Sequence, residues 1–234
     1  MNRKSLRGRV RWIASLALVA AAASALWAYE HAGLAWRVRR RFPVGVDVSH
    51  HQGAIDWQRV SKDGIAFAFI KATEGGTWTD PLFATNWSEA RKHGIPRGAY
   101  HFFTFCTQGE VQARHFLQVV PQDPDALPTL VDLEMEGNCS RRPSVDELER
   151  ELTGFLSLVE AAQQRKAILY VTEEFLREYG RVASQRQLFI RAIGPEPPRM
   201  EGRSWTYWQF DDEGRVDGIN GPVDLDAFVG EKSR

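Results

Sequence analysis

Three acidic side chains alternate with apolar ones in the stretch PTLVDLEME, residues 128–136. Asp132, Glu134 and Glu136 are separated by single apolar residues. Strict alternation is the period of a β-strand, so the three carboxyls share one face. Neighbouring carboxyls can divide the work of acid catalysis, because burial and nearby negative charge keep one protonated while another stays ionised. An amphipathic strand with a solvated face gives the same pattern. The surrounding sequence is needed to distinguish a catalytic site from a solvated face.

The elements around this stretch predict a barrel. Five helical patterns, at residues 56–62, 81–93, 110–120, 144–165 and 173–181, alternate with short strand-like runs, and alternating strands and helices indicate a parallel sheet. After residue 181 the connections are too short for crossover helices. We therefore predict an α/β fold of eight strands whose last third lacks helices. The eight runs are VGVDVS, IAFAFIKA, GAYHFFTF, TLVDLEM, AILYVT, LFIRAI, WTYWQF and VDLDAF.

In such a barrel the functional groups gather where the strands end. Asp47 ends the first predicted strand, Asp132 and Glu134 end the fourth, and Asp224 lies on the last. We therefore expect four carboxyls, far apart in sequence, to converge on one mouth. Solvated faces of unrelated strands would not predict this placement.

Seven motifs in order along the chain resemble those of the family 25 glycoside hydrolases, the Chalaropsis-type lysozymes. They are GVDVSHHQGAIDW (45–57), FAFIKATEG (67–75), RGAYHFF (97–103), LPTLVDLE (127–134), ILYVT (168–172), YWQF (207–210) and GPVDLDAF (221–228). The resemblance implies a flattened TIM-like barrel of five β/α units followed by three strands lacking helices. It also implies N-acetylmuramidase activity, which hydrolyses the β-1,4 bond between N-acetylmuramic acid and N-acetylglucosamine in peptidoglycan, and it implies no cofactor.

The resemblance also implies a role for individual residues. Glu134 is then the general acid and Asp132 supports the charge that develops at the sugar, whereas Glu136 lies past the family motif and is expected to be dispensable. The substrate-binding positions are Asp47, Asp224, Tyr100 and Trp208. Glycoside hydrolysis needs one protonated and one ionised carboxyl, which agrees with this assignment.

The sequence leaves three chemical questions open. Residues two apart on a strand lie about 6.6 Å apart along its axis, which does not decide between retention and inversion, and the N-acetyl group of the substrate is an alternative nucleophile. A metal-dependent hydrolase using Asp47, His50 and His51 is a second reading, although no further ligand cluster accompanies them. A glycan-binding module without activity is a third.

The first 41 residues differ in charge from the rest. They hold nine of the 30 basic residues and one of the 30 acidic ones, so residues 42–234 carry a net charge of −8. A domain of this charge is a poor nucleic-acid binder. We therefore divide the chain into a basic cytoplasmic tail, membrane or signal segment and spacer at 1–41 and one catalytic domain at 42–234. We expect a monomer.

An uncharged segment, residues 12–29, follows five basic residues and predicts a membrane signal anchor. As a helix its 18 residues would span about 27 Å, near the thickness of a hydrocarbon core. A signal peptide cleaved near Ala25 is the alternative. The domain is then exported and either anchored in the inner membrane, facing the periplasm or cell exterior, or secreted.

An exported domain can hold a disulfide, and the chain has two cysteines, Cys106 and Cys139. They follow the third and fourth predicted strands, which are neighbours in a barrel, so we expect them to be bonded. Two free thiols are the alternative.

Overall fold

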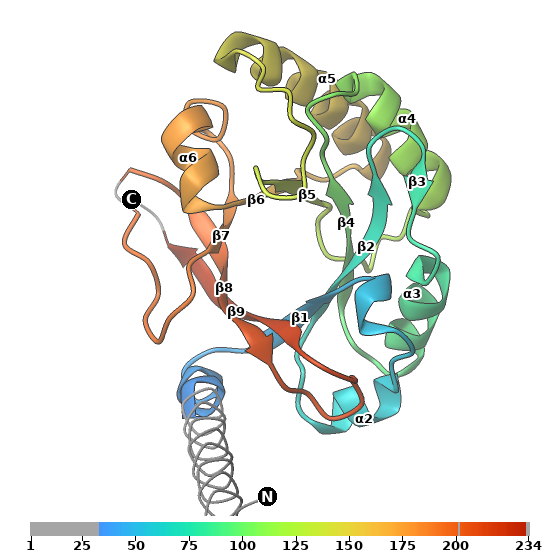
Figure 1. Ribbon diagram of the computed structural model, residues 1–234. Coiled ribbons are helices and arrows are strands. Elements are labelled where there is room, and N and C mark those ends of the chain that lie inside the picture. The colour runs from blue at the N-terminus through green and yellow to red at the C-terminus, as the bar shows by residue number, and fades with distance from the viewer. Residues whose placement is uncertain (1–32, 201, 233–234) are drawn as a thin grey trace, which may run out of the picture.

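The computed structural model describes residues 33–200 and 202–232, and in it the chain forms a closed barrel (Figure 1). The strands run in the order β1, β9, β8, β7, β6, β5, β4, β2, and β1 pairs again with β2. The two-residue strand β3 is added outside this ring, antiparallel to β2. The strands are β1 (Val44–Val48), β2 (Ala68–Glu74), β3 (Trp78–Thr79), β4 (Arg97–Phe102), β5 (Leu130–Leu133), β6 (Ile168–Val171), β7 (Leu188–Arg191), β8 (Trp205–Gly214) and β9 (Val223–Lys232).

Five α-helices connect the first six barrel strands. They are α2 (Trp57–Lys62), α3 (Phe83–Lys92), α4 (Gly109–Val119), α5 (Val145–Gln163) and α6 (Glu173–Tyr179). All pairs from β1–β2 round to β7–β8 are parallel, whereas β9 is antiparallel to both of its neighbours. The predicted fold of five β/α units followed by three strands without helices is confirmed. The strand β3 was not predicted, because two residues carry no readable period.

The helices begin where side chains can cap them. Asp56, Ser144 and Thr172 each accept a hydrogen bond from a backbone N–H in the first turn of α2, α5 and α6. Such caps satisfy amide groups that the helix itself leaves without partners. The connections that follow the strands are thereby fixed at the end of the barrel where the strands terminate.

Two apolar layers stabilise the barrel. The larger lies between the strands and the surrounding helices. The smaller fills the barrel interior with Phe67, Phe69, Leu130, Ile168, Tyr170, Phe189 and Tyr207. Gly45 is required here, because a Cβ atom at this position would lie 2.4 Å from the ring of Phe67. The aromatic interior closes the barrel below its mouth.

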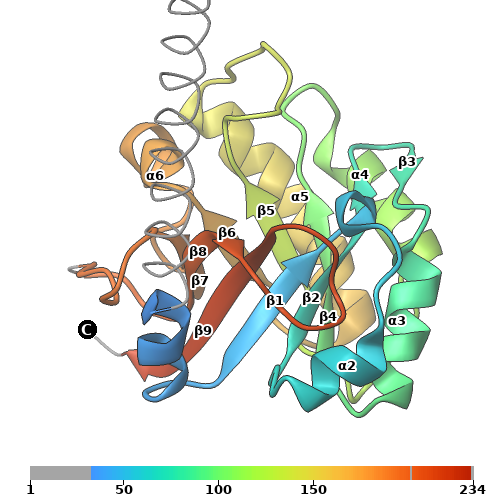
Figure 2. The same cartoon turned by 60° about the horizontal axis from the view of Figure 1, so that its bottom comes forward.

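Residues 33–39 are helical and pack against the barrel (Figures 1 and 2). Leu34 and Val38 are 9% and 1% exposed and join the larger apolar layer. Arg39 donates to the backbone oxygen of Asp63 at 2.6 Å and pairs with its carboxyl at 3.1 Å. The packed unit therefore begins before residue 42, where we had predicted its edge.

Asp63 lies between α2 and β2, at the end of the barrel where the parallel strands begin. The helical residues 33–39 consequently sit near the end opposite the mouth (Figure 2). No helix in the described part of the chain is long and apolar enough to cross a membrane. The predicted membrane segment, residues 12–29, lies outside the described residues.

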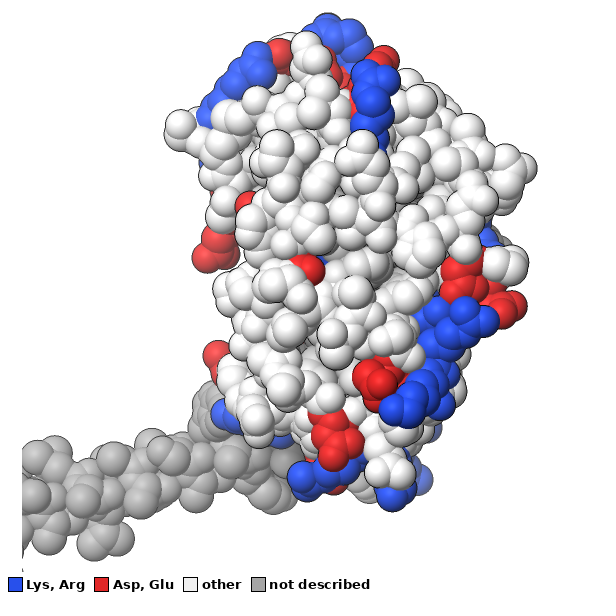
Figure 3. Space-filling model, turned by 90° about the vertical axis from the view of Figure 1, so that its right-hand side faces the viewer, with Lys and Arg blue, Asp and Glu red and all other residues white. Residues whose placement is uncertain are grey.

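Charges of both signs are interspersed on the face shown in Figure 3. Basic and acidic side chains adjoin one another near its rim, and most of its middle is uncharged. The surface around helix α3 shows the same mixing, since Lys92 pairs with Glu89 at 2.9 Å and Arg91 with Asp125 at 3.9 Å. Exposed pairs of this kind contribute little to stability.

Candidate active site

Four carboxyls meet at the mouth of the barrel. Asp47 on β1, Asp132 on β5, Glu134 one residue beyond β5, and Asp224 on β9 line one cavity of about 100 Å³. Tyr100, Leu130 and Tyr170 complete its lining. The structure thus brings together the acids that sequence reasoning had placed on separate strands.

Glu136 lies apart from these four. Its side chain is exposed and does not line the cavity. The strand ends at Leu133, and the chain turns away through Gly137, whose φ of 70° favours glycine. The alternation of acidic and apolar residues in 128–136 therefore continues beyond the end of the strand.

Burial dominates the electrostatics of Glu134 and Asp132. It raises the pKa of Glu134 to about 7, although Arg191 opposes the shift. It also raises the pKa of Asp132 well above its usual range; Glu134 adds to the shift and Lys71 opposes it. Burial therefore raises the pKa of both carboxyls, whereas the sequence led us to expect this for only one of them. A developing positive charge on a sugar would favour the ionised form of Asp132, as Lys71 already does.

Asp47 and Asp224 form a hydrogen-bonded pair. Two carboxyls can share a hydrogen bond only when one of them holds a proton. Burial raises the pKa of Asp47 well above its usual range, with Asp224 next in effect, whereas the pKa of Asp224 rises to about 6. The pair therefore binds one proton and carries one negative charge.

Two cations flank the mouth. Lys71 on β2 pairs with Glu74 at 2.8 Å and lies 4.9 Å from the ring centroid of Phe102. Arg191 on β7 pairs with Asp212 at 2.7 Å. Each cation thus has a carboxylate partner of its own while its charge also acts on the cavity acids.

The prediction for Trp208 is wrong. Its side chain is 0% exposed, belongs to the apolar layer outside the strands, and donates from Nε1 to the backbone oxygen of Ala192 at 2.6 Å. Successive residues of a strand face opposite sides, so Tyr207 and Gln209 face the barrel interior instead. Tyr100, by contrast, lines the cavity as expected.

Sequence reasoning missed two residues behind the acids. The hydroxyl of Tyr170 on β6 donates to Oε1 of Gln209 on β8 at 2.5 Å, and Gln209 lies opposite Asp226 in the β8–β9 ladder. The signal was available in principle, because the two motifs ILYVT and YWQF each place one polar side chain on the inward face. The position of these two residues could not be predicted from the motifs without knowing which face of each strand points into the barrel.

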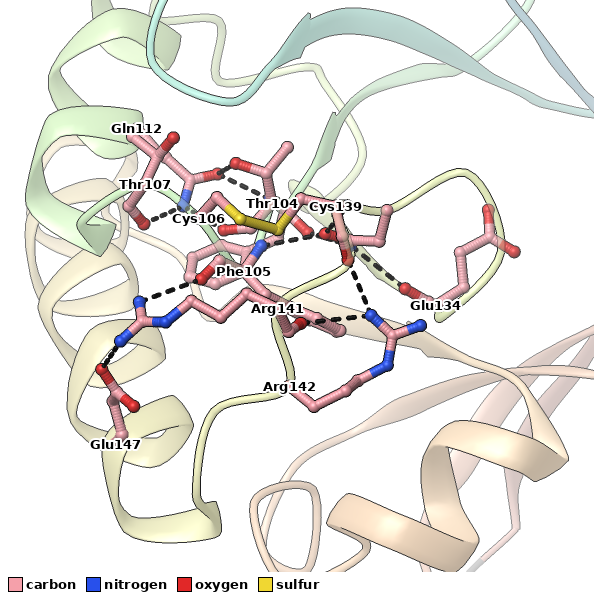
Figure 4. The surroundings of a disulfide bond; sticks show 12 residues. Thr104, Phe105, Cys106, Thr107, Gln112, Glu134, Cys139, Arg141, Arg142 and Glu147 are labelled. Atoms are coloured by element: carbon pink, nitrogen blue, oxygen red, sulfur yellow. Dashed lines mark hydrogen bonds and ion pairs between the residues drawn. A yellow bond between two sulfur atoms is a disulfide. The ribbon is translucent and has the colours of Figure 1, made fainter.

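Cys106 and Cys139 are bonded, as expected, with a Cα–Cα distance of 6.2 Å. The bond joins the connection after β4 to the turn that begins at Glu134 (Figure 4). Asn138 reinforces this junction: its amide group donates to the backbone oxygens of Phe103 and Glu134 at 2.9 and 3.1 Å. The segment that presents Glu134 is thus held on both sides.

The geometry does not favour a metal site. His50 uses Nδ1 for Asp80 at 3.0 Å, and within the described residues no three His, Cys, Asp or Glu side chains are arranged to hold an ion. A larger cavity of about 310 Å³ lies beside the disulfide. Its acids are already partnered, Glu147 by Arg141 and Glu151 by the backbone N–H of Gly109, so the carboxyl-lined mouth is the better candidate.

Comparison with known proteins identifies the family. The model of the glycosyl hydrolases family 25 matches residues 46–219. The chain belongs to this family. It is therefore a glycoside hydrolase.

Individual relatives agree with this assignment. The uncharacterized protein YegX of Escherichia coli K12 is 40% identical over 80% of this chain and 69% of its own length. Lysozyme M1 of Streptomyces globisporus is 32% identical over 81% of this chain and 69% of its own. A family 25 glycosyl hydrolase from Bacillus anthracis superposes with a TM-score of 0.76 and 37% identity, covering 82% of this chain and 90% of that one.

Proposed function

We propose that this family 25 hydrolase is a muramidase that cleaves the β-1,4 bond after N-acetylmuramic acid in peptidoglycan, with Glu134 as the proton donor. One observation carries the assignment of the donor. Among the cavity acids, Glu134 is the one whose pKa of about 7 suits a group that must hold a proton near neutrality and release it during the reaction. The family relationship supports peptidoglycan as the substrate class.

In the proposed mechanism Glu134 gives its proton to the glycosidic oxygen as the bond to the sugar breaks. The ring then gains positive charge, which Asp132 and the ionised member of the Asp47–Asp224 pair stabilise. Asp132 meets this charge in its ionised form, which the neighbouring cation favours. Attack of water on the sugar carbon completes the hydrolysis.

Mass spectrometry of the fragments released from purified peptidoglycan tests this function. We expect muropeptides that end in a reducing N-acetylmuramic acid. Fragments that end in a reducing N-acetylglucosamine would assign a different bond, and the release of peptides without new reducing ends would contradict a glycosidase altogether. EDTA is expected to leave the rate unchanged, which separates this mechanism from the metal-dependent alternative.

We further propose that the enzyme is exported and held at the membrane by residues 12–29, with the barrel outside. The support is the uncharged run itself and the five basic residues that precede it. N-terminal sequencing of the protein from fractionated cells is the test. An uncleaved chain in the membrane fraction is expected, whereas a soluble protein that starts at Leu26 would show a cleaved signal peptide.

A further inference from the structure

The side chain of Asn138 joins the turn that follows Glu134 to the connection that follows β4. Its Nδ2 donates to the backbone oxygens of Phe103 at 2.9 Å and Glu134 at 3.1 Å. Its Oδ1 accepts from the backbone N–H groups of Phe105 at 2.9 Å and Cys139 at 3.0 Å. A side-chain amide has two N–H donors and two acceptor positions. Asn138 therefore uses its full hydrogen-bonding capacity in this junction.

These four hydrogen bonds fix the orientation of the Asn138 amide. In the flipped orientation its NH₂ group would face two N–H donors and its oxygen would face two carbonyl oxygens, so that no bond could form. A single nitrogen atom of Asn138 therefore links the backbone oxygens of Phe103 and Glu134 and holds them at a fixed separation.

The backbone of Glu134 lies just beyond the sheet. The ladder between β4 and β5 ends with Asp132, whose backbone oxygen accepts from the N–H of Phe103 at 3.0 Å. Residues 134–140 form neither helix nor strand. The bond from Asn138 therefore extends the connection between the two segments by two residues, from Asp132 to Glu134.

Asn138 acts on a substrate only through Glu134. It is not among the residues that line the cavity, whereas Glu134 lines it and points its carboxyl away from the disulfide (Figure 4). A general acid must lie within hydrogen-bond reach of the oxygen that it protonates. A displacement of about 1 Å can lower the rate of an enzyme about 10²-fold.

We propose that Asn138 is a positioning residue, whose amide group fixes the backbone of Glu134 against the connection after β4 so that the carboxyl meets the glycosidic oxygen. The proposal rests on the proposed function, because it concerns the same proton donor. The bond between Cys106 and Cys139 joins the same two segments. It limits how far the turn can open, and Asn138 sets where Glu134 lies within that limit.

The leaving group of the substrate separates a positioning role from a structural one. The test uses two β-glycosides of the N-acetylglucosaminyl-N-acetylmuramic acid disaccharide, one that releases phenol and one that releases 2,4-dinitrophenol. Phenolate departs slowly unless it gains a proton, whereas dinitrophenolate departs without one. A displaced proton donor therefore slows hydrolysis of the phenyl glycoside far more than that of the dinitrophenyl glycoside. A general loss of structure slows both equally.

Asn138→Ala in the full-length protein should show this dependence on the leaving group. We expect kcat to fall about 10- to 100-fold on the phenyl glycoside and less than about threefold on the dinitrophenyl glycoside, with little change in KM. Asn138→Asp keeps an oxygen for both N–H groups but lacks the NH₂ donor, so it should show the same pattern. Equal losses on the two glycosides, or native kcat in both variants, would overturn the proposal.

Arg142→Ala is the matched control for the turn. Arg142 donates to the backbone oxygens of Cys139 and Arg141 at 2.7 and 3.1 Å, so this variant loses two hydrogen bonds of the same turn but keeps the one to Glu134. Both glycosides should be hydrolysed at native rates. A loss confined to the phenyl glycoside and as large as that of Asn138→Ala would overturn the specific role of Asn138.

Glu134→Gln distinguishes failure of this proposal from failure of the proposed function. Because it has no proton to give, its kcat should fall about 10²- to 10⁴-fold on the phenyl glycoside and much less on the dinitrophenyl glycoside. Equal losses in Glu134→Gln would show that Glu134 is not the proton donor, and both proposals would fail. The expected pattern in Glu134→Gln with equal losses in Asn138→Ala would overturn the role of Asn138 alone.

Discussion

Glu134 and Glu136 provide a matched pair of substitutions, since they lie two residues apart and only one lines the cavity. Glu134→Gln keeps shape and hydrogen bonding but cannot give a proton, so turnover should fall about 10²- to 10⁴-fold while glycan binding persists. Glu136→Gln should retain near-native turnover. Reducing ends released from peptidoglycan measure both, and equal losses would contradict the assignment of the acid.

Asp132→Asn should also reduce turnover strongly. It removes the charge that opposes the cationic transition state, an effect worth about 10² or more in rate for a preorganised group. Because the carboxyl and amide have nearly the same shape, KM should change little. A variant that keeps native kcat would show that the charge of Asp132 takes no part in the reaction.

Activity should pass through a narrow maximum between about pH 6 and pH 7. The general acid must be protonated, so activity falls as the pH rises through the pKa of Glu134, about 7. Asp224 must be ionised, so activity also falls as the pH drops below its pKa of about 6. A profile of kcat/KM measured from pH 4 to pH 9 checks both limbs, because it reports the pKa values of the free enzyme. Full activity at pH 9 would be inconsistent with Glu134 as the donor.

Burial of the Asp226 carboxyl lowers the stability of the folded protein above about pH 4. Asp226 is 0% exposed, neither of its oxygens has a hydrogen-bond partner among the described residues, and burial raises its pKa well above the usual range. The folded protein therefore binds a proton that the unfolded chain loses above about pH 4, and stability falls by about 1.4 kcal/mol per pH unit until the folded pKa is reached.

Asp226→Asn should remove this penalty. Its free energy of unfolding is expected to exceed that of the native protein by an amount that grows from pH 4 to pH 7, measured by urea denaturation. Asp125→Asn, which changes a side chain that is 79% exposed, is the control and should show no such trend. A constant difference across this range would mean that Asp226 is ionised in the fold.

At the scale of elements, the disulfide is the strongest constraint on the segment that presents Glu134. It closes a loop of 33 residues, for which chain entropy predicts a stabilisation of about 3 to 4 kcal/mol. Cys106→Ser combined with Cys139→Ser should lose this amount, measured by urea denaturation. Dithiothreitol should weaken the native protein and leave the double variant unaffected; no effect on either would mean that the bond adds nothing to stability.

The arrangement of the elements could be predicted because it follows from periodicity. Alternation and helical spacing determine the five β/α units, and the rule for strand ends brings Asp47, Asp132, Glu134 and Asp224 together. The face of an individual strand was harder to predict. On β8 the inward residues are Tyr207 and Gln209, but the strand is apolar on both sides, so Trp208 offered no evidence against an inward position.

Protonation could not be predicted for a different reason. A pKa depends on how deeply each carboxyl is buried and on which cation approaches it, and both are tertiary properties. Lys71 and Arg191 come from strands that are distant in sequence from Glu134, so their effect is visible only in the folded barrel. Asn138 is similar, since three of its four backbone partners, Phe103, Phe105 and Glu134, come together with it only after folding.

At the scale of the molecule, residues 33–39 should behave as part of the barrel. Val38→Ala is expected to lower the free energy of unfolding by about 1 to 2 kcal/mol, because it leaves a gap in a packed layer. Trp36→Ala, on the exposed side of the same helical residues, should have little effect. Thermal denaturation distinguishes the two, and equal effects would mean that the helical residues are not docked in solution.

Docking of these residues limits how far an anchored enzyme could reach. Only residues 30–32 separate the proposed membrane segment from the packed helical residues, a link of at most about 10 Å when fully extended. The cavity also opens at the end of the barrel opposite the docked helix. An enzyme anchored in this way could not reach glycan strands far from the membrane. It would cut glycan strands at one fixed height, in the layer of peptidoglycan closest to the membrane.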